Sequence, residues 1–535
     1  MATPLLEVEN LSVAYRENNH NQRVTHGVSF SIAAGEVVAL VGESGSGKTS
    51  TAQAVIGLLP ENGRIESGAI RLNGEDIATW SNKRLDTIRG KQISLIPQDP
   101  TSSLNPVKTI GRQVGEIFRL HGTQDQRDVD RQVVELLDRV GLNDPELRAR
   151  QYPHELSGGM KQRVLIAIAI ALKPQLIIAD EPTSALDVTV QRRILDLIDN
   201  LRREFGTAVL LVTHDLGVAG DRADRIVVLQ GGRIQEAGES RELLRDPRST
   251  YAKRLLSDAP SLAPASSRSI QARGDDNAIV VDRLVHDFDI AGRERFRAVD
   301  GVSFAVRRGT THALVGESGS GKTTTVRDVV GFGRPTAGEI RIAGTDLRSL
   351  KGDALRQFRQ RIQLVYQNPF SSLDPRQTVF GIVEEPLRNF GVSRGADRAS
   401  KVRALLERVG LPEELHQRRP RALSGGQRQR VAIARALVVD PEVVVLDEAV
   451  SALDVTVQAQ ILRLLDELQR ERGLTYLFVS HDLAVVRQIS DTVSVLQNGR
   501  QVESGRVEDV FLRPQAPYTR ELIDAIPGKR SQAHV

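Results

Sequence analysis

The sequence contains no cysteine among its 535 residues. This absence excludes disulfides, zinc sites built on thiolates and iron–sulfur clusters. Long apolar runs are also missing, because the longest candidate, Val164–Leu172, is much shorter than the roughly 20 residues that cross a bilayer as a helix. The N-terminus carries no signal-peptide pattern. The sequence therefore predicts a protein that is made and kept in the cytosol.

The chain also lacks a strong bias of charge. Its formal net charge is +4, and the arginines are interspersed with glutamate and aspartate rather than gathered in blocks. A nucleic-acid-binding protein usually concentrates lysine and arginine on one surface. The sequence gives no support to nucleic acid as a partner.

The octamer Gly-Glu-Ser-Gly-Ser-Gly-Lys-Thr occurs twice, at residues 42–49 and 316–323. Each copy follows a short apolar run and precedes a segment that can begin a helix, which is the pattern of a phosphate-binding P-loop. The glycines let backbone N–H groups converge on phosphate oxygens at a helix N-terminus. One such match could arise by chance, but two identical octamers leave chance negligible. The lysine would reach the β- and γ-phosphates and the next threonine would offer its hydroxyl to Mg²⁺; these residues are Lys48, Thr49, Lys322 and Thr323.

Other landmarks recur in step with the P-loops. Lys322 follows Lys48 by 274 residues, and Glu448 follows Glu181 by 267 residues. Such a long repeat is a whole domain rather than a solenoid unit, so we expect two large α/β domains. The expected limits are residues 1–257 and 278–535, joined by a flexible linker over residues 258–277 that is rich in Ser, Ala, Pro and Arg.

An acidic pair ends an apolar run in each repeat. Leu176–Ala179 precedes Asp180 and Glu181, and a similar run precedes Asp447 and Glu448. Such runs are typical of strands buried on both faces of a parallel sheet, whose carboxyl ends are where ligands bind. The aspartate can then hold Mg²⁺ and the glutamate can act as general base on the attacking water. Two surface carboxylates at a strand end are the alternative for either pair taken alone.

The segments Leu156–Met160, Leu-Ser-Gly-Gly-Met, and Leu423–Gln427, Leu-Ser-Gly-Gly-Gln, precede the acidic runs. With these elements in this order, the sequence strongly resembles ABC ATPases, whose signature motif is Leu-Ser-Gly-Gly-Gln. The resemblance covers essentially the whole chain. It implies two tandem P-loop ABC ATPase domains of α/β class, each with a mainly parallel core sheet, an antiparallel β subdomain and a helical subdomain.

The resemblance also implies roles for particular residues. His214 and His481 match the switch histidine that contacts the γ-phosphate, and residues 184–187 and 451–454 match the D-loops. Tyr15 and Phe288 occupy the place of the aromatic that stacks on adenine, although either could be a core aromatic. The expected Mg²⁺ ligands are Thr49, Gln98, Asp180, Thr323, Gln367 and Asp447. The remaining expected ATP contacts are Gly42, Ser44, Gly45, Ser46, Gly47, Ser50, Ser157, Gly158, Gly159, Met160, Gly316, Ser318, Gly319, Ser320, Gly321, Thr324, Ser424, Gly425, Gly426 and Gln427.

A signature motif offers backbone N–H groups at a helix start, and its partner in this family is the P-loop of the opposite domain. We therefore expect two ATP molecules between the halves, with both sites catalytic but not equivalent. Met160 stands where Gln427 stands, and Ala449-Val450 replaces Pro182-Thr183. Because Met lacks the amide of Gln, the site closed by the first signature is expected to bind ATP modestly less tightly.

The segments Pro97–Pro106 and Tyr366–Pro375 resemble the extended Q-loop of the ATPases that drive oligopeptide and dipeptide importers. Tails at Asp246–Leu256 and Arg513–Ile523 are similar to the Pro-Tyr-Thr tail of the same group. The resemblance implies two integral-membrane permease subunits and an extracytoplasmic solute-binding protein as partners. It places the chain at the cytoplasmic face of a prokaryotic membrane. The tail cysteines that hold an iron–sulfur cluster in some relatives are absent.

The competing interpretation is a soluble tandem ABC ATPase that acts on the ribosome or another cytosolic assembly. Translation-linked members carry a long basic helical insert between the halves, whereas the linker here is short. The cargo stays open, because the ATPase subunits do not touch it; peptides, glutathione, metal complexes and some sugars are all candidates. The interval from Lys to the signature Ser differs in length between the repeats, which suggests that each half docks a different membrane subunit.

Overall fold

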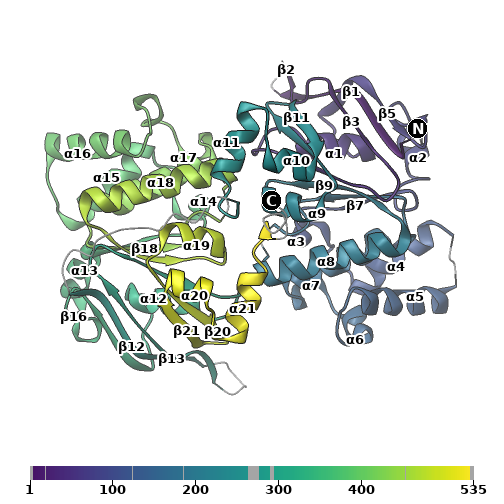
Figure 1. The fold of residues 1–535 in the computed structure, drawn as a ribbon. Coiled ribbons are helices and arrows are strands. Elements are labelled where there is room, and N and C mark those ends of the chain that lie inside the picture. The colour runs from purple at the N-terminus through teal and green to yellow at the C-terminus, as the bar shows by residue number, and fades with distance from the viewer. Residues whose placement is uncertain are drawn as a thin grey trace. The chain divides into compact units, whose positions relative to one another are not determined.

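The computed structural model describes residues 4–17, 20–122, 125–184, 186–262, 276–289, 295–451 and 453–529. Contacts divide the chain into two compact units, one built mainly from residues before 264 and the other mainly from residues after it (Figure 1). Helix α11 of the first unit ends at Asp258, and strand β12 of the second begins at Asn277. Residues 263–275 of the expected linker lie outside the described residues, so the domain limits at 257 and 278 stay predictions.

The first unit contains two sheets. A six-stranded sheet has the order β11-β10-β4-β9-β8-β7, in which only β11 is antiparallel to its neighbour. An antiparallel sheet has the order β2-β1-β5-β6, with β3 also paired to β1. The strands are β1 (Leu6–Glu17), β2 (His20–Arg23), β3 (Val28–Ile32), β4 (Val37–Val41), β5 (Gly63–Leu72), β6 (Glu75–Asp76), β7 (Ile93–Ile96), β8 (Leu176–Asp180), β9 (Ala208–Thr213), β10 (Arg225–Gln230) and β11 (Arg233–Glu239).

The apolar runs of the sequence form the centre of the six-stranded sheet. Every residue of β4, β8 and β9 is buried, as expected for parallel strands covered on both faces. One face packs with helix α1 and the antiparallel sheet into a single hydrophobic core. The P-loop and the acidic pair therefore emerge from rigid, central strands.

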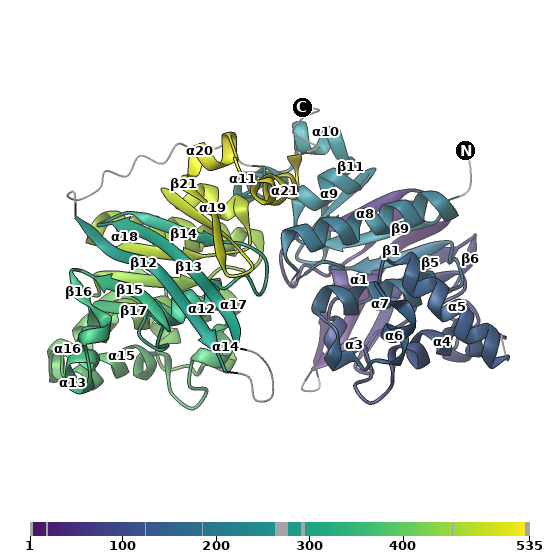
Figure 2. The same ribbon diagram turned by 90° about the horizontal axis from the view of Figure 1, so that it is seen from below.

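The helices of the first unit supply the third expected part, the helical subdomain, beside the core sheet and the antiparallel sheet. Helices α4, α5 and α6 pack on one another, and α4 and α5 also pack on α7; together they form the helical subdomain (Figure 2). The helices are α1 (Lys48–Ile56), α2 (Asn82–Leu85), α3 (Pro100–Ser103), α4 (Ile110–Leu120), α5 (Gln126–Arg139), α6 (Pro145–Arg150), α7 (Gly158–Ile170), α8 (Val188–Phe205), α9 (Leu216–Arg222), α10 (Ser240–Arg245) and α11 (Thr250–Asp258).

The second unit repeats this architecture. Its six-stranded sheet has the order β17-β18-β19-β14-β20-β21, and its antiparallel sheet has the order β13-β12-β15-β16. The strands are β12 (Asn277–Phe288), β13 (Phe296–Arg307), β14 (Thr311–Val315), β15 (Ala337–Ile342), β16 (Thr345–Asp346), β17 (Ile362–Val365), β18 (Val443–Asp447), β19 (Thr475–Val479), β20 (Thr492–Gln497) and β21 (Arg500–Arg506). The helices are α12 (Lys322–Val329), α13 (Gly352–Arg361), α14 (Pro369–Ser372), α15 (Val379–Phe390), α16 (Gly395–Arg408), α17 (Gly425–Leu437), α18 (Val455–Arg472), α19 (Leu483–Ile489), α20 (Val507–Leu512) and α21 (Pro517–Asp524).

The two units differ most between the P-loop lysine and the Q-loop glutamine. Strand β5 has 10 residues, whereas its counterpart β15 has 6. Much of the length difference noted in the sequence therefore lies in the antiparallel sheet, before the helical subdomain begins. The helical subdomains therefore differ less in length than the whole interval from the P-loop lysine to the signature serine. The hypothesis that each half docks a different membrane subunit stays a prediction.

The structure also bears on the membrane question. Among the described residues, the helices are either too short or too polar to span a bilayer.

Candidate ATP-binding and hydrolysis site

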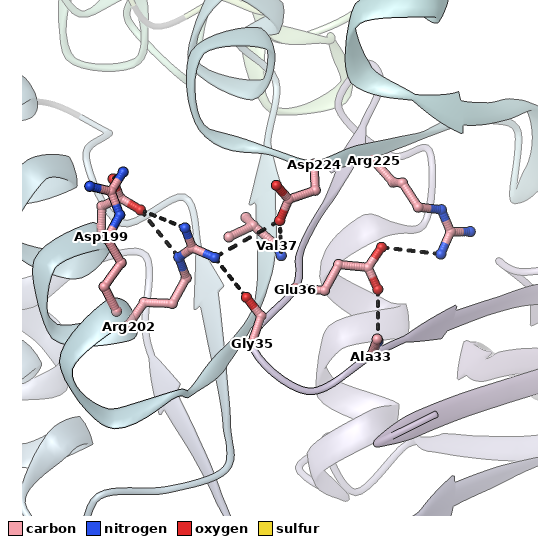
Figure 3. Close-up of polar contacts among 9 residues, drawn as sticks. Ala33, Gly35, Glu36, Val37, Asp199, Arg202, Asp224 and Arg225 are labelled. Carbon is pink, nitrogen blue, oxygen red and sulfur yellow. Dashed lines mark hydrogen bonds and ion pairs between the residues drawn. The ribbon is translucent and has the colours of Figure 1, made fainter. Parts of the chain in front are cut away.

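A polar network fixes the start of β4, the strand that leads into the first P-loop (Figure 3). The Asp224 carboxylate accepts a hydrogen bond from the backbone N–H of Val37 at 2.8 Å. Arg202 from α8 donates to the carbonyl oxygen of Gly35 at 2.6 Å, and Glu36 accepts from a backbone N–H three residues earlier at 2.7 Å. These bonds pair backbone N–H and C=O groups of the turn before β4 with side chains. They therefore fix the position of the strand that leads into the P-loop.

Glycine is required in the P-loop by its backbone shape. Gly45 and Gly47 have φ angles of 76° and 95°, in the left-handed region that residues with a side chain rarely adopt. A Cβ atom on Gly42, whose φ angle is 152°, would come within 2.2 Å of the carbonyl oxygen of Leu229. In the second unit a Cβ atom on Gly316 would come equally close, 2.2 Å, to the carbonyl oxygen of Leu496.

The P-loop lysine is buried and bonded to the loop itself. Lys48 Nζ donates to the carbonyl oxygens of Gly42 at 2.8 Å and Glu43 at 2.9 Å. Lys322 Nζ donates to Gly316 at 2.6 Å and Glu317 at 2.8 Å. The ammonium group is thus held over the loop, where it can neutralise a bound phosphate.

The helix that follows each P-loop begins at the lysine. Helix α1 starts at Lys48 after Gly47, and no side chain caps its first turn. The N–H groups and the positive dipole end at such a helix start favour an anion. Helix α12 begins at Lys322 after Gly321 in the same way.

The acidic pair of the first unit lies beside the start of helix α1. The Thr49 hydroxyl donates to Asp180 Oδ1 at 3.3 Å. Burial, together with the charge of Glu181, raises the pKa of Asp180 to about 6. A buried carboxylate and a hydroxyl at one point are oxygen ligands of the kind that Mg²⁺ prefers, and the cation would offset the cost of burying the charge. The residues present therefore fit a magnesium ion bound with the phosphates.

Glu181 lies at the point where three strand ends converge. Gln98, which follows β7, donates its Nε2–H to Glu181 Oε2 at 2.8 Å. His214, which follows β9, places Nδ1 3.1 Å from Glu181 Oε1. In the second unit Gln367 Nε2 lies 2.7 Å from Glu448 Oε2, and His481 Nδ1 lies 3.4 Å from the same oxygen. Each half thus brings its predicted glutamine, glutamate and histidine together.

These contacts set the charge of the glutamate. Burial alone raises the pKa of Glu181, but the hydrogen bond and charge of His214, with Lys48 and Gln98, outweigh burial and lower that pKa below its usual value. Burial likewise opposes protonation of His214, yet the bond to Glu181 raises the pKa of the histidine. The same opposed shifts occur at Glu448 and His481. An ionised glutamate beside a hydrogen-bonded histidine can accept a proton from water.

The glutamates also carry a backbone conformation that the sequence does not signal. Glu181 has a φ angle of 46° and Glu448 one of 47°. Side-chain-bearing residues in this left-handed region are costly, on the order of 1–3 kcal/mol each. The backbone N–H of Glu181 donates to the Val212 carbonyl oxygen of β9 at 2.8 Å. The neighbouring strand therefore holds the strained residue in place.

Within each unit, the signature segment lies apart from the P-loop. Helix α7, which begins after Ser157, packs on the edge strand β7, whereas the P-loop follows β4 in the middle of the sheet. The Ser157 hydroxyl accepts from Met160 N–H at 3.3 Å, and the Ser424 hydroxyl accepts from Gln427 N–H at 3.3 Å. Gln427 Oε1 also accepts from Ser424 N–H at 2.9 Å. In this structure the glutamine therefore caps its own helix, a bond that Met160 cannot make.

The two predicted adenine-stacking aromatics lie in different surroundings. Tyr15 on β1 donates its hydroxyl hydrogen to Ser50 Oγ at 2.9 Å and packs against the core of the antiparallel sheet. Phe288 ends β12 with 44% of its surface exposed, and its ring centre lies 4.6 Å from that of His286. Within the D-loops, residues 185 and 452 lie outside the described residues.

Some features of the site had only a weak signal in the sequence. Tyr251 and Tyr518 lie in the tails that resemble those of importer ATPases, and the structure places each hydroxyl within hydrogen-bond distance of a P-loop N–H group. No sequence pattern distinguished Asp224, which holds the start of β4.

Comparison with known proteins agrees with this geometry. A model of the ABC transporter family matches residues 25–184 and 299–451, and a model of the oligopeptide/dipeptide transporter C-terminal region matches residues 502–534. Relatives at least 40% identical extend over nearly the whole chain. The chain belongs to the ABC transporter family. It is an ATP-binding and ATP-hydrolysing protein with two ABC ATPase domains, as the resemblance in the sequence implied.

Three relatives of this ABC ATPase illustrate its place in the family. It is 40% identical to the oligopeptide transport ATP-binding protein OppD of Mycobacterium tuberculosis, with 98% of each chain covered. It is 42% identical to the peptidoglycan transport ATP-binding protein YejF of Agrobacterium fabrum, over 98% of this chain and 96% of that one. Identity to the glutathione import ATP-binding protein GsiA of Pectobacterium atrosepticum is 42%, over 98% and 89%. The ribosomal alternative finds no support among these relatives.

Proposed function

We propose that this ABC ATPase powers an importer of peptides or of a related small solute. The observation that carries the proposal is the match along nearly the full chain to transport ATPases that are named for oligopeptide, peptidoglycan and glutathione transport. The match of the second tail to the oligopeptide/dipeptide transporter region supports the same class. A peptide is the first cargo to test, because two of the three named cargoes are peptides and the third contains peptide.

Within each half, the proposed chemistry follows the contacts around the glutamate. Glu181 and Glu448 act as general bases on the attacking water, oriented by Gln98 and Gln367. His214 and His481 hold the glutamates from the other side and face the γ-phosphate. Bound Mg²⁺ would neutralise phosphate charge. Its proposed ligands are Thr49, Gln98, Asp180, Thr323, Gln367 and Asp447.

The two halves are proposed to act as a pair. Each ATP would contact the P-loop of one half and the signature of the other, with Tyr15 or Phe288 against its adenine. Ser157 and Ser424 stand at exposed helix starts, where backbone N–H groups are available to a phosphate. Gln427 caps its own helix, whereas Met160 at the equivalent position of the first signature cannot. We therefore expect the two sites to differ in ATP affinity because the two signature helices differ in the stability of their first turn.

The proposed partners are two integral-membrane permease subunits, with an extracytoplasmic solute-binding protein acting through them. The chain itself would then lie peripherally at the cytoplasmic face of the membrane. The docking residues are expected on the helical subdomains α4–α6 and α15–α16.

Co-expression with two candidate permease subunits tests the proposal. We expect the chain alone to stay in the supernatant with weak ATPase activity, and to sediment with membranes only when both subunits are present. Uptake of a labelled peptide into vesicles should then require ATP and both general bases. Co-purification with ribosomes in place of membranes would contradict the importer.

A further inference from the structure

A short tail helix follows the core sheet in each unit and carries a buried tyrosine in its first turn. Helix α11 carries Tyr251 as its second residue, and helix α21 carries Tyr518 at the same place. Both side chains are at least nine-tenths buried. The family model for the tail matches only the second of them, yet the two helices occupy equivalent positions 267 residues apart.

Each tyrosine hydroxyl meets the second residue of a P-loop. The backbone N–H of Glu43 donates to Tyr251 Oη at 3.1 Å, and that of Glu317 donates to Tyr518 Oη at 3.0 Å. The carbonyl oxygens of these same two glutamates accept from the P-loop lysines at 2.9 and 2.8 Å. One P-loop residue is therefore held at its N–H by the tail and at its C=O by the lysine.

The tail helix is itself anchored to the core sheet. Glu236 on β11 accepts from the backbone N–H groups of Arg248 at 2.9 Å and Ser249 at 2.8 Å. Glu503 on β21 accepts from Gln515 at 2.8 Å and Ala516 at 3.0 Å. A carboxylate that binds two backbone N–H groups fixes the chain entering the helix. The tyrosine hydroxyl is thus located by the same sheet that carries the P-loop.

We propose that Tyr251 and Tyr518 are positioning residues of the two ATP sites, each holding its P-loop in the shape that receives phosphate. When ATP enters, the lysine turns from the glutamate carbonyl toward the β- and γ-phosphates. The tyrosine bond then holds the backbone N–H of that residue, while the N–H groups of Ser46 and Ser320 still donate to the two glutamate carbonyl oxygens at 3.2 and 3.1 Å. With the lysine bond gone, the contribution of the tyrosine is larger in the nucleotide-bound state. The tail following each core sheet therefore serves the ATP site, a role independent of the cargo or the membrane partners.

A purely structural role is the competing explanation, since a buried aromatic ring also fills the core. Tyrosine-to-phenylalanine variants separate the two roles, because they keep the ring and remove only the hydroxyl. Tyr476 provides a matched control: it is buried, and its hydroxyl donates to the Leu465 carbonyl oxygen at 3.0 Å within the core. Tyr476→Phe removes a comparable hydrogen bond away from the P-loop.

The experiment measures MgADP affinity by calorimetry on the full chain, one site at a time. Tyr251→Phe is examined with Lys322→Ala present, so that the second site is weakened and the first dominates the binding signal, and Tyr518→Phe with Lys48→Ala present. Loss of one hydrogen bond should weaken MgADP binding about 2- to 10-fold. With both lysines intact, each tyrosine variant should raise the KM for ATP and change kcat less than about twofold.

The control defines the result that overturns the proposal. Tyr476→Phe should lower the melting temperature and leave MgADP affinity unchanged. If the tyrosine variants lower only the melting temperature, or if Tyr476→Phe weakens MgADP binding equally, the tail tyrosines are core residues and nothing more. Failure to take up peptide would leave this test unaffected, because it depends on nucleotide binding alone.

Discussion

Replacing both proposed general bases, Glu181→Gln with Glu448→Gln, tests the reaction most directly. Gln98 lies 2.8 Å from one oxygen of Glu181, and His214 lies 3.1 Å from the other. Glutamine has the same shape, so its oxygen can accept from Gln98 while its amide donates to a neutral histidine. The glutamine variant loses the charge that raises the pKa of His214, which favours that neutral form. The fold and the P-loop should therefore be preserved.

The expected effect falls on the chemical step. A positioned general base contributes about 10²- to 10⁴-fold to rate, which corresponds to about 2.7–5.4 kcal/mol of barrier. The amide cannot take a proton from water, so kcat of the double variant should fall by this factor. ATP affinity should change little, because the lysines and the P-loop N–H groups are untouched. The free energy of unfolding should fall by less than about 1 kcal/mol, since both hydrogen bonds can be replaced.

Phosphate release at saturating MgATP, together with ATP binding measured by calorimetry, checks both parts. Glu467→Gln is the control, because that exposed carboxylate pairs with Arg408 on the surface. Hydrolysis in the double variant within tenfold of the unaltered protein would refute the assignment of the base. The single variants examine the two sites: if one abolishes turnover and transport while the other leaves both intact, the chain has one working site.

Three further outcomes are expected. Lys48→Ala and Lys322→Ala should each weaken ATP binding, and together abolish hydrolysis; a double variant that turns over at the original rate would contradict the nucleotide assignment. Gly42→Ala should lower the melting temperature more than Gly45→Ala, because its Cβ would meet a backbone carbonyl oxygen at 2.2 Å while that of Gly45 meets nothing within 4 Å. Burial lowers the pKa of His312 from its usual 6.5 to about 3. Between these pH values the unfolded chain binds a proton that the folded chain does not. The free energy of unfolding should therefore fall as pH drops from about 6.5 toward 3, by up to roughly 1.4 kcal/mol per pH unit. His312→Val should flatten that dependence in chemical unfolding between pH 7 and 5, and an unchanged slope would show that this histidine does not cause it.

The sequence alone was enough to predict the elements whose chemistry lies in contiguous residues. The P-loop could be recognised because its glycines, lysine and threonine act within one turn, and the local backbone is dictated by the glycines themselves. The apolar runs before Asp180 and Asp447 indicated central parallel strands because such strands are buried on both faces, and all five residues of β8 are buried. The duplication then indicated the same architecture twice.

Only the tertiary structure decided how distant residues meet. Gln98, Glu181 and His214 come from the ends of three strands, and their contacts depend on the strand order of the sheet. The left-handed backbone of Glu181 is held by a bond to β9, so the sequence around the glutamate does not reveal it. The contact between Tyr251 and Glu43 spans 208 residues. Local sequence specifies conformation over a few residues, whereas such contacts depend on packing that the whole chain determines.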